Sequence, residues 1–194
     1  MSKLILVVGG QAVGKMTVSE SISKKSGIPM TMNHDSHDLA AKIFGWGNPA
    51  QKELSRKIRF DTFNTAINNN IDLIFTYVWA FDQKDDWDFV KTISDLFSGE
   101  IYIVELVADM KVRLHRNQTE YRLAMKPSKR NIEDSEKHLI GDMEKYRLIS
   151  NEGEVESVFP NYIRINNSNL YPDEVADIVI DRFGLCSREE VKQR

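Results

Sequence analysis

The sequence has almost no cysteine and no long hydrophobic stretch, and these two absences limit what the chain can be. Its one cysteine, Cys186, has no partner within the chain, so we exclude an internal disulfide and expect a reducing, cytoplasmic location. No apolar run approaches the length of a membrane span, and the strand-like start of the chain is too short for a signal peptide. We therefore expect neither a secreted scaffold nor a membrane protein.

The chain also lacks a strong excess of charge. Its 26 Lys and Arg stand against 29 Asp and Glu, and the net charge of −3 argues against a nucleic-acid-coating protein. A length of 194 residues with 41% hydrophobic residues suits one α/β domain with a proper core. We expect a single domain over residues 1–186 and a loose, charged tail at 187–194. The sequence carries no signal of the oligomeric state.

A glycine-rich stretch at residues 9–17 is the most informative pattern that is present. Gly9, Gly14 and Lys15 match the G-x-x-x-x-G-K core of a phosphate-binding loop, the Walker A motif. A β-favouring apolar run precedes this stretch and a helical apolar pattern follows it, as the motif requires. A plain tight turn before a buried helix is the alternative. The pattern predicts that ATP binds to Gly9, Gly10, Gln11, Ala12, Val13, Gly14, Lys15, Met16 and Thr17.

One position of the loop departs from the strict motif. Met16 stands where Ser or Thr normally supplies a hydroxyl to Mg²⁺. Because Mg²⁺ usually retains several waters, one more water can replace that hydroxyl. Thr17 is a poor substitute, since the next helix position points about 100° away. We expect Mg²⁺ to bind together with ATP, but loosely.

Strand-like and helical patterns alternate along the whole chain. Apolar, strand-like runs occur at 4–8, 28–32, 71–79, 101–107 and 162–165. The stretches between them show the spacing of amphipathic helices, and one such helix is expected to begin near Asp134. This alternation predicts an α/β fold of three layers, with a parallel sheet covered on both faces. The nearly continuous apolar run at 71–79 should lie centrally in that sheet.

A basic segment follows the fourth predicted strand. Between Arg113 and Arg130, six Lys and Arg residues stand against a single acid, Glu120. One interpretation is an ordinary solvated helix face. The other is an arginine-rich lid, over about 113–131, that brings positive charge to the transferring phosphate and excludes water. Arg113 and Arg116 share one helical face, so at least one of them could point towards the loop.

An acid stands after the second predicted strand. Asn33, His34 and Asp35 lie there, at the edge of the sheet where ligands bind in open α/β folds. Asp35 could hold Mg²⁺ through water or accept a proton from an acceptor hydroxyl. Alternatively, it only caps the next helix. His34 is a weaker candidate, and we expect Asp38 to be an exposed helix residue.

No sequence motif identifies the residues that would bind the acceptor. Four aromatic residues could either wall an acceptor pocket or belong to the core: Phe44, Trp46, Tyr77 and Trp79. Arg56 and Arg59 could bind an anionic acceptor or be exposed helix charge. The third predicted strand does not lead into the Asp-x-x-Gly of a GTPase, so we do not expect that activity.

These motifs resemble those of small P-loop kinases of the nucleoside-monophosphate kinase and shikimate kinase type. More closely, they look like a group of small bacterial proteins identified as shikimate kinase-like or AAA-type ATP-binding proteins. The matching stretches are Gly-Lys-Met-Thr-Val at 14–18, Asn33-His34, and Arg-Leu-Ala-Met-Lys-Pro-Ser-Lys-Arg at 122–130. The resemblance extends from Lys3 to about Phe183. It implies a P-loop kinase fold whose five-stranded parallel sheet has the order 2-3-1-4-5.

The resemblance also implies roles for four residues. Lys15 would bind ATP, and Asp35 would serve Mg²⁺ or the acceptor. Arg116 and Arg122 would clamp the phosphates from the lid. Shikimate kinases carry an Asp-x-Asp pair where this chain has Asn-His-Asp at 33–35, which argues against shikimate as the acceptor.

The predicted function is ATP-dependent and Mg²⁺-dependent phosphoryl transfer to a small-molecule acceptor. Two alternatives stay open at this point. One is a nucleotide-binding regulatory module with little catalysis, which Met16 favours. The other is a kinase acting on nucleotides or nucleic-acid ends, with the basic segment as its contact surface.

Overall fold

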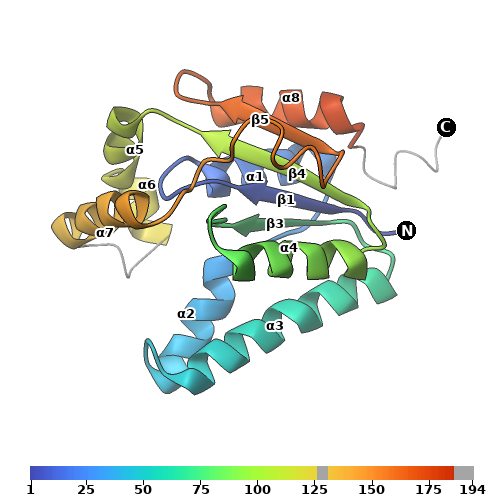
Figure 1. Ribbon diagram of the computed structural model, residues 1–194, viewed down its shortest axis with the longest axis horizontal. Helices are drawn as coiled ribbons and strands as arrows, with labels where there is room; N and C mark the ends of the chain where they lie inside the picture. The colour runs from blue at the N-terminus through green and yellow to red at the C-terminus, as the bar shows by residue number, and fades with distance from the viewer. Residues whose placement is uncertain (126–130, 186–194) are drawn as a thin grey trace.

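A five-stranded parallel sheet forms the centre of the molecule (Figure 1). The computed structural model describes residues 1–125 and 131–185. Its strands are β1 (Leu4–Val8), β2 (Met30–Met32), β3 (Leu73–Tyr77), β4 (Ile101–Val107) and β5 (Tyr162–Asn166). Its helices are α1 (Lys15–Ser26), α2 (Asn33–Phe44), α3 (Pro49–Asn68), α4 (Lys84–Leu96), α5 (Met110–Asn117), α6 (Glu120–Met125), α7 (Ile132–Lys145) and α8 (Pro172–Phe183). The sheet order is β2-β3-β1-β4-β5, which confirms the predicted order.

β1 is the central strand, and all five of its side chains are apolar and buried. Its first residue, Leu4, lies opposite Leu73 of β3 and Ile101 of β4, with both neighbours parallel. Since successive side chains of a strand point to opposite faces, β1 contributes alternately to two separate cores. Burial on both faces explains why this strand is a continuous apolar run.

Helices cover both faces of the sheet (Figure 1). On one face, Ile22 of α1 and Val179 of α8 join the core beneath them. On the other face, Phe63 of α3 and Ile93 of α4 join the second core. The predicted three-layer α/β fold is therefore confirmed.

The third strand is shorter than predicted. Its predicted range was 71–79, but β3 spans Leu73–Tyr77. Ile71 is exposed, whereas Trp79 is fully buried in the core beyond the end of the strand. Apolar composition marks burial and does not show where pairing between strands ends. β2 and α7 likewise begin two residues away from their predicted starts.

Two groups of helices flank the edge at which the strands end (Figure 1). α2 and α3 form a hairpin on one side, and α5, α6 and α7 lie together on the other. The predicted lid includes α5 and α6, whereas Lys126, Lys129 and Arg130 lie outside the described residues, as does the predicted tail at 187–194. Within residues 1–125 and 131–185, no helix is long and apolar enough to cross a membrane.

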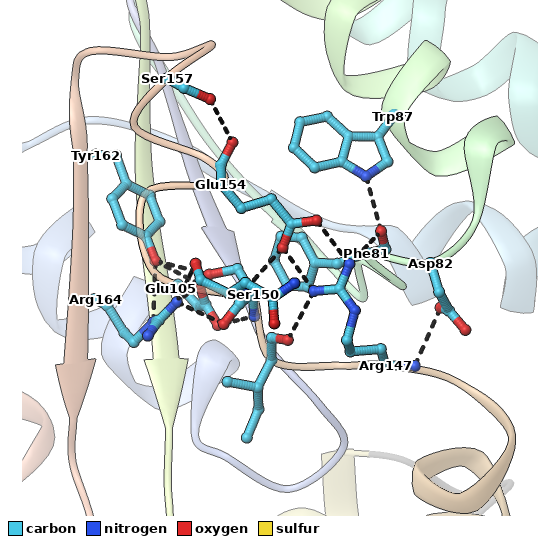
Figure 2. A network of polar contacts seen from close by, with 12 residues as sticks. Phe81, Asp82, Trp87, Glu105, Arg147, Ser150, Glu154, Ser157, Tyr162 and Arg164 are labelled. Carbon is cyan, nitrogen blue, oxygen red and sulfur yellow. Dashed lines mark hydrogen bonds and ion pairs between the residues drawn. The ribbon is translucent and has the colours of Figure 1, made fainter.

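A buried carboxylate holds the segment between α7 and β5 against the sheet (Figure 2). Glu105 of β4 is fully buried. It accepts a hydrogen bond from the Ser150 backbone N–H at 3.0 Å and one from each of the Ser150 and Tyr162 hydroxyls at 2.5 Å. Arg164 of β5 places its Nε 3.4 Å from the same carboxylate and supplies the opposite charge. These partners offset the desolvation of a charge inside the protein.

We expect Glu105→Ala to lower the free energy of unfolding by about 3 kcal/mol, because removing one member of a buried network leaves its partners unpaired. Glu156→Ala, at an exposed position of the same segment, is the control and should change it by less than about 0.5 kcal/mol. Urea unfolding of both variants measures the difference. Equal effects in the two variants would show that the network does not stabilise the fold.

Candidate active site

The turn between β1 and α1 contains two glycines that no larger residue could replace without a shift. Gly9 has a φ of 138°, and a Cβ atom there would lie 2.4 Å from the Leu106 carbonyl oxygen of β4. A Cβ atom on Gly10 would lie 2.7 Å from Arg113 Nη2. The loop therefore lies directly against β4 and α5, and glycine permits this close approach.

Lys15 is the first residue of α1, and its side chain folds back over the loop. Its Nζ donates hydrogen bonds to the Gly9 and Gly10 carbonyl oxygens, each at 2.7 Å. The ammonium group therefore lies at the loop, where the motif predicted it. Thr17 is also engaged locally, since its hydroxyl donates to the Gly14 carbonyl at 3.0 Å.

Two arginines of α5 donate hydrogen bonds to carbonyl oxygens of the loop. Arg113 is only 3% exposed, and its Nε donates to the Gln11 carbonyl at 2.8 Å. Arg116 donates from Nη1 to the Val13 carbonyl at 3.0 Å. The buried Asn167, which follows β5, donates its side-chain N–H to that same carbonyl at 2.8 Å. The sequence predicts that at least one of the two arginines points towards the loop, and both do.

Holding these carbonyls also orients the amides of the loop. In a trans peptide the C=O and the following N–H point in opposite directions. Bonds to the Gln11 and Val13 carbonyls therefore direct the Ala12 and Gly14 N–H groups to the other side of the loop. Ala12 and Gly14 both line the adjacent cavity. Backbone N–H groups gathered at a helix N-terminus form an anion-binding site.

The cavity beside the loop has a volume of about 690 Å³. It lies between the loop, the end of β3, the helix α2 with the turn that follows it, and the helices α5 and α6. The residues that line it are Gln11, Ala12, Gly14, Lys15, Met16, Thr17, Met32, Asn33, His34, His37, Asp38, Trp46, Thr76, Tyr77, Val78, Arg116, Thr119, Tyr121, Arg122 and Pro172. A cavity of this size can hold a nucleotide triphosphate group together with a small molecule.

The two lid arginines named from the sequence both line this cavity. Arg122 of α6 also donates from Nε to Asn117 Oδ1 at 3.0 Å. Burial lowers the pKa of Arg116 and of Arg122, but a guanidinium stays protonated at neutral pH. The cavity therefore has two fixed positive charges in addition to Lys15. For α5, the interpretation as a solvated face is wrong, because Arg113 is buried.

The acids of α2 divide into one that caps the helix and one that faces the cavity. Asp35 is not the N-cap residue but stands three positions later, and its Oδ2 accepts from the Met32 backbone N–H at 2.9 Å. Its side chain is half exposed, and Asp35 is not among the residues that line the cavity. Asp38 is partly buried and does line the cavity, so the prediction of an exposed Asp38 is wrong.

His37 is held in a neutral, oriented state beside Asp38. The Gln51 side-chain Nε2 lies 3.2 Å from His37 Nδ1. Because an amide nitrogen can only donate, this hydrogen bond places the imidazole proton on Nε2. Burial lowers the pKa of His37, and the positive charge of Arg59 lowers it further. His37 thus contributes a neutral ring to the cavity wall.

Some of the aromatic and basic residues that could bind an acceptor line the cavity, and the others do not. Tyr77 and Trp46 line the cavity, whereas Trp79 belongs to the core and Phe44 is not a lining residue. Arg59 donates to Asn33 Oδ1 at 2.5 Å and lies over the Phe89 ring. Arg56 lies over the Phe60 ring. Neither arginine lines the cavity, and both make their contacts with other residues of the protein.

The hydrogen bond from Asn167 to the loop could not be predicted from the sequence. The only sign of a functional role for Asn167 is the run Asn-Asn-Ser-Asn at 166–169, at the end of the last strand. Its role requires a contact with the loop that lies 154 residues away in the chain. Such a pairing of distant segments depends on the strand order, which the residue pattern alone does not specify.

The described residues contain no group of three or more His, Cys, Asp or Glu side chains that could hold a metal ion by themselves. Mg²⁺ in phosphoryl-transfer sites is instead commonly held by nucleotide phosphates, waters and one or two carboxylates. Asp35 and Asp38 both belong to the first two turns of α2, beside the cavity or in its wall. The residues present therefore fit a metal that arrives with the nucleotide.

The fold and the loop place the chain in a class, the P-loop fold of the shikimate kinase type. A sugar kinase from Janibacter sp. HTCC2649 is 11% identical, with a TM-score of 0.59 over 95% of this chain and 96% of that one. A shikimate kinase from Bacteroides thetaiotaomicron is 14% identical, with a TM-score of 0.58 over 94% and 99%. The tunicamycin resistance protein of Deinococcus radiodurans is 15% identical, with a TM-score of 0.58 over 95% and 97%. At these identities the likeness establishes the fold alone.

No protein-family model and no curated protein matches the sequence.

We expect the titration of His37 to make the fold less stable in acid. Its pKa is lowered from 6.5 in the folded state, so the unfolded chain binds this proton more readily. The stabilisation by a neutral His37 is present above pH 6.5 and is lost as the pH falls below it. Urea unfolding across this range should show a smaller pH dependence for His37→Gln than for the wild type. Identical pH dependence in the two proteins would show that His37 is not held neutral.

Proposed function

We propose that this protein is an ATP-dependent phosphotransferase that acts on a small-molecule acceptor. The observation that carries the proposal is the loop between β1 and α1, whose Gln11 and Val13 carbonyl oxygens accept hydrogen bonds from Arg113 and Arg116. This arrangement leaves the loop amides and Lys15 to bind phosphate. The fold shared with a sugar kinase and a shikimate kinase supports the same conclusion.

In this proposal residues 9–17 hold the ATP phosphates and Lys15 binds the β- and γ-phosphates. Arg116 and Arg122 approach the same cavity from the lid side. Their charge would stabilise the negative charge that develops on the transferring phosphoryl group. Exclusion of water by the lid favours transfer to the acceptor over hydrolysis.

Mg²⁺ would enter with ATP and supply charge neutralisation at the phosphates. The Met16 side chain has no oxygen and Met16 lines the cavity, so a water would take the place of the usual hydroxyl. We propose that Asp35 orients such a water from beside the cavity. Its Oδ2 caps the helix, and its Oδ1 lies 3.6 Å from Nε2 of His34, which lines the cavity.

The nucleic-acid alternative is less well supported than transfer to a small molecule. The basic segment would have to present its charge on the surface. Arg113 is instead buried against the loop, and Arg116 faces the cavity while it donates to the Val13 and Asn167 carbonyl oxygens. The regulatory alternative still rests on Met16 and is decided by whether ATP is consumed.

Lys15→Ala should weaken ATP binding by about tenfold or more, because a charge-assisted hydrogen bond contributes about 1.5–3 kcal/mol. Titration calorimetry with ATP and Mg²⁺ measures the affinity, and thermal unfolding checks that the fold persists. Lys24→Ala, an exposed position on the same helix, is the matched control and should bind normally. Unchanged ATP affinity in Lys15→Ala would overturn the proposed function.

Met16→Ser should lower the Mg²⁺ concentration needed for half-maximal ATP turnover, because it restores an oxygen ligand. Met16→Ala is the matched control, since it removes the thioether without adding a hydroxyl. A shift in Met16→Ser alone identifies the hydroxyl as the cause. Equal Mg²⁺ dependence in all three proteins would mean that the metal is held elsewhere. If all three bind ATP but none consumes it with any acceptor, the protein is a regulatory module.

A further inference from the structure

The charges that line the cavity are distributed unevenly between its two sides. Among the described residues that line it, the Lys and Arg side chains are Lys15, Arg116 and Arg122. All three belong to the loop or to the lid helices. The side formed by α2 carries one carboxylate, Asp38, and two histidines. Nucleotide phosphates therefore match one side of the cavity, and a second molecule must match the other.

Arg59 lies in the wall of this second side, and its positive charge acts on His37, but its guanidinium is engaged within the protein. Its Nη1 donates to Asn33 Oδ1 at 2.5 Å, and its guanidinium lies 5.5 Å from the centre of the Phe89 ring. Its Nε is buried without a hydrogen-bond partner among the described residues and is therefore closed to a ligand. Arg59 is also absent from the residues that line the cavity. A carboxylate or phosphate placed here would face Asp38, and no Lys or Arg among the described residues lines this side of the cavity.

The remaining surface on this side is aromatic. Trp46, at the tip of the hairpin, is 64% exposed and lines the cavity. Tyr77 donates its hydroxyl to Asp86 Oδ1 at 2.6 Å and packs against Phe89, so it offers ring surface rather than a free hydroxyl. Aromatic rings bind apolar rings through their faces and also attract cations.

Asp38 is placed differently from Asp35. It lies one turn after His34, so the two side chains occupy the same face of α2, and both line the cavity. No hydrogen bond within the described part of the chain engages the Asp38 carboxylate, whereas Asp35 accepts from the Met32 N–H. Asp38 can therefore accept a proton or a hydrogen bond from a bound molecule.

We propose that the α2 side of the cavity binds an uncharged or cationic acceptor with an apolar ring, and that Asp38 binds its reacting hydroxyl. This inference rests on the proposed phosphotransferase function. The acceptor oxygen forms a bond to the γ-phosphorus of ATP, and the bond from that phosphorus to the bridging oxygen breaks. ADP leaves with the bonding electron pair, and the hydroxyl proton passes to the Asp38 carboxylate.

The test compares three glycosides that share a sugar and a phenyl ring and differ in charge. They are phenyl β-glucoside, which is neutral, phenyl β-glucosaminide, which carries an amine, and phenyl β-glucuronide, which carries a carboxylate. Calorimetry is performed on the full chain saturated with the non-hydrolysable β,γ-imido analogue of ATP. We expect the neutral and cationic glycosides to bind at least about tenfold more tightly than the glucuronide, because the glucuronide carboxylate would lie next to the Asp38 carboxylate.

Variants of Asp38 and Trp46, with one control variant, test whether these two residues cause the selectivity. Asp38→Asn should reduce the difference in affinity between the glucoside and the glucuronide, whereas Asp61→Asn, at an exposed position of α3, should preserve it. Trp46→Ala should weaken phenyl β-glucoside but not methyl β-glucoside, which lacks the ring. For ADP formation with phenyl β-glucoside, Asp38→Asn should lower kcat by roughly 10²–10⁴-fold, the range that a general base supplies, without changing ATP affinity.

Each outcome decides the proposal. Preference for the glucuronide, binding of none of the three glycosides, or no ADP formation with any of them overturns it, as does normal kcat in Asp38→Asn. The proposed function is judged separately by ATP binding in Lys15→Ala. Loss of ATP binding in that variant together with preference for the glucuronide would retain the phosphotransferase and reject only this acceptor.

Discussion

The candidate site depends on hydrogen bonds to carbonyl oxygens of the glycine-rich loop between β1 and α1. Arg113, Arg116 and Asn167 all donate to carbonyl oxygens of the loop, from elements that lie between 102 and 154 residues later in the chain. Without these bonds the peptide planes of a glycine-rich loop could rotate, and its amides would have no fixed direction. The loop therefore acquires its binding geometry only when α5 and the end of β5 are in place.

Features encoded by neighbouring residues could be predicted from the sequence. The spacing of Gly9, Gly14 and Lys15, between an apolar run and a helical pattern, is local and was sufficient to place the loop. The alternation of patterns predicted the three layers. The strand order came from the resemblance to P-loop kinases, because alternation alone fits several orders. Strand ends were less accurate, since Trp79 is buried beyond the end of β3.

Which residues of α2 face the cavity could not be predicted, because contacts with α3 set the rotation of that helix. The Ser36 and Ser55 hydroxyls lie 3.0 Å apart in a buried contact between the two helices, and Gln51 holds His37. Such polar contacts leave no hydrophobic period in the sequence. The sequence therefore predicts Asp38 in solvent, whereas Asp35 is favoured by its position next to the strand and by the resemblance to P-loop kinases.

The cavity is built from two parts that can change independently. α2 packs mainly against α3 and reaches the sheet near β2 and β3, whereas the loop is held by α5 and the segment after β5. A substitution on the cavity face of α2 would alter the proposed acceptor side without disturbing any bond to a loop carbonyl. In evolutionary terms, a protein of this fold can acquire a new acceptor through a few changes in one short helix. Among relatives, acceptor choice is thus expected to diverge sooner than nucleotide binding.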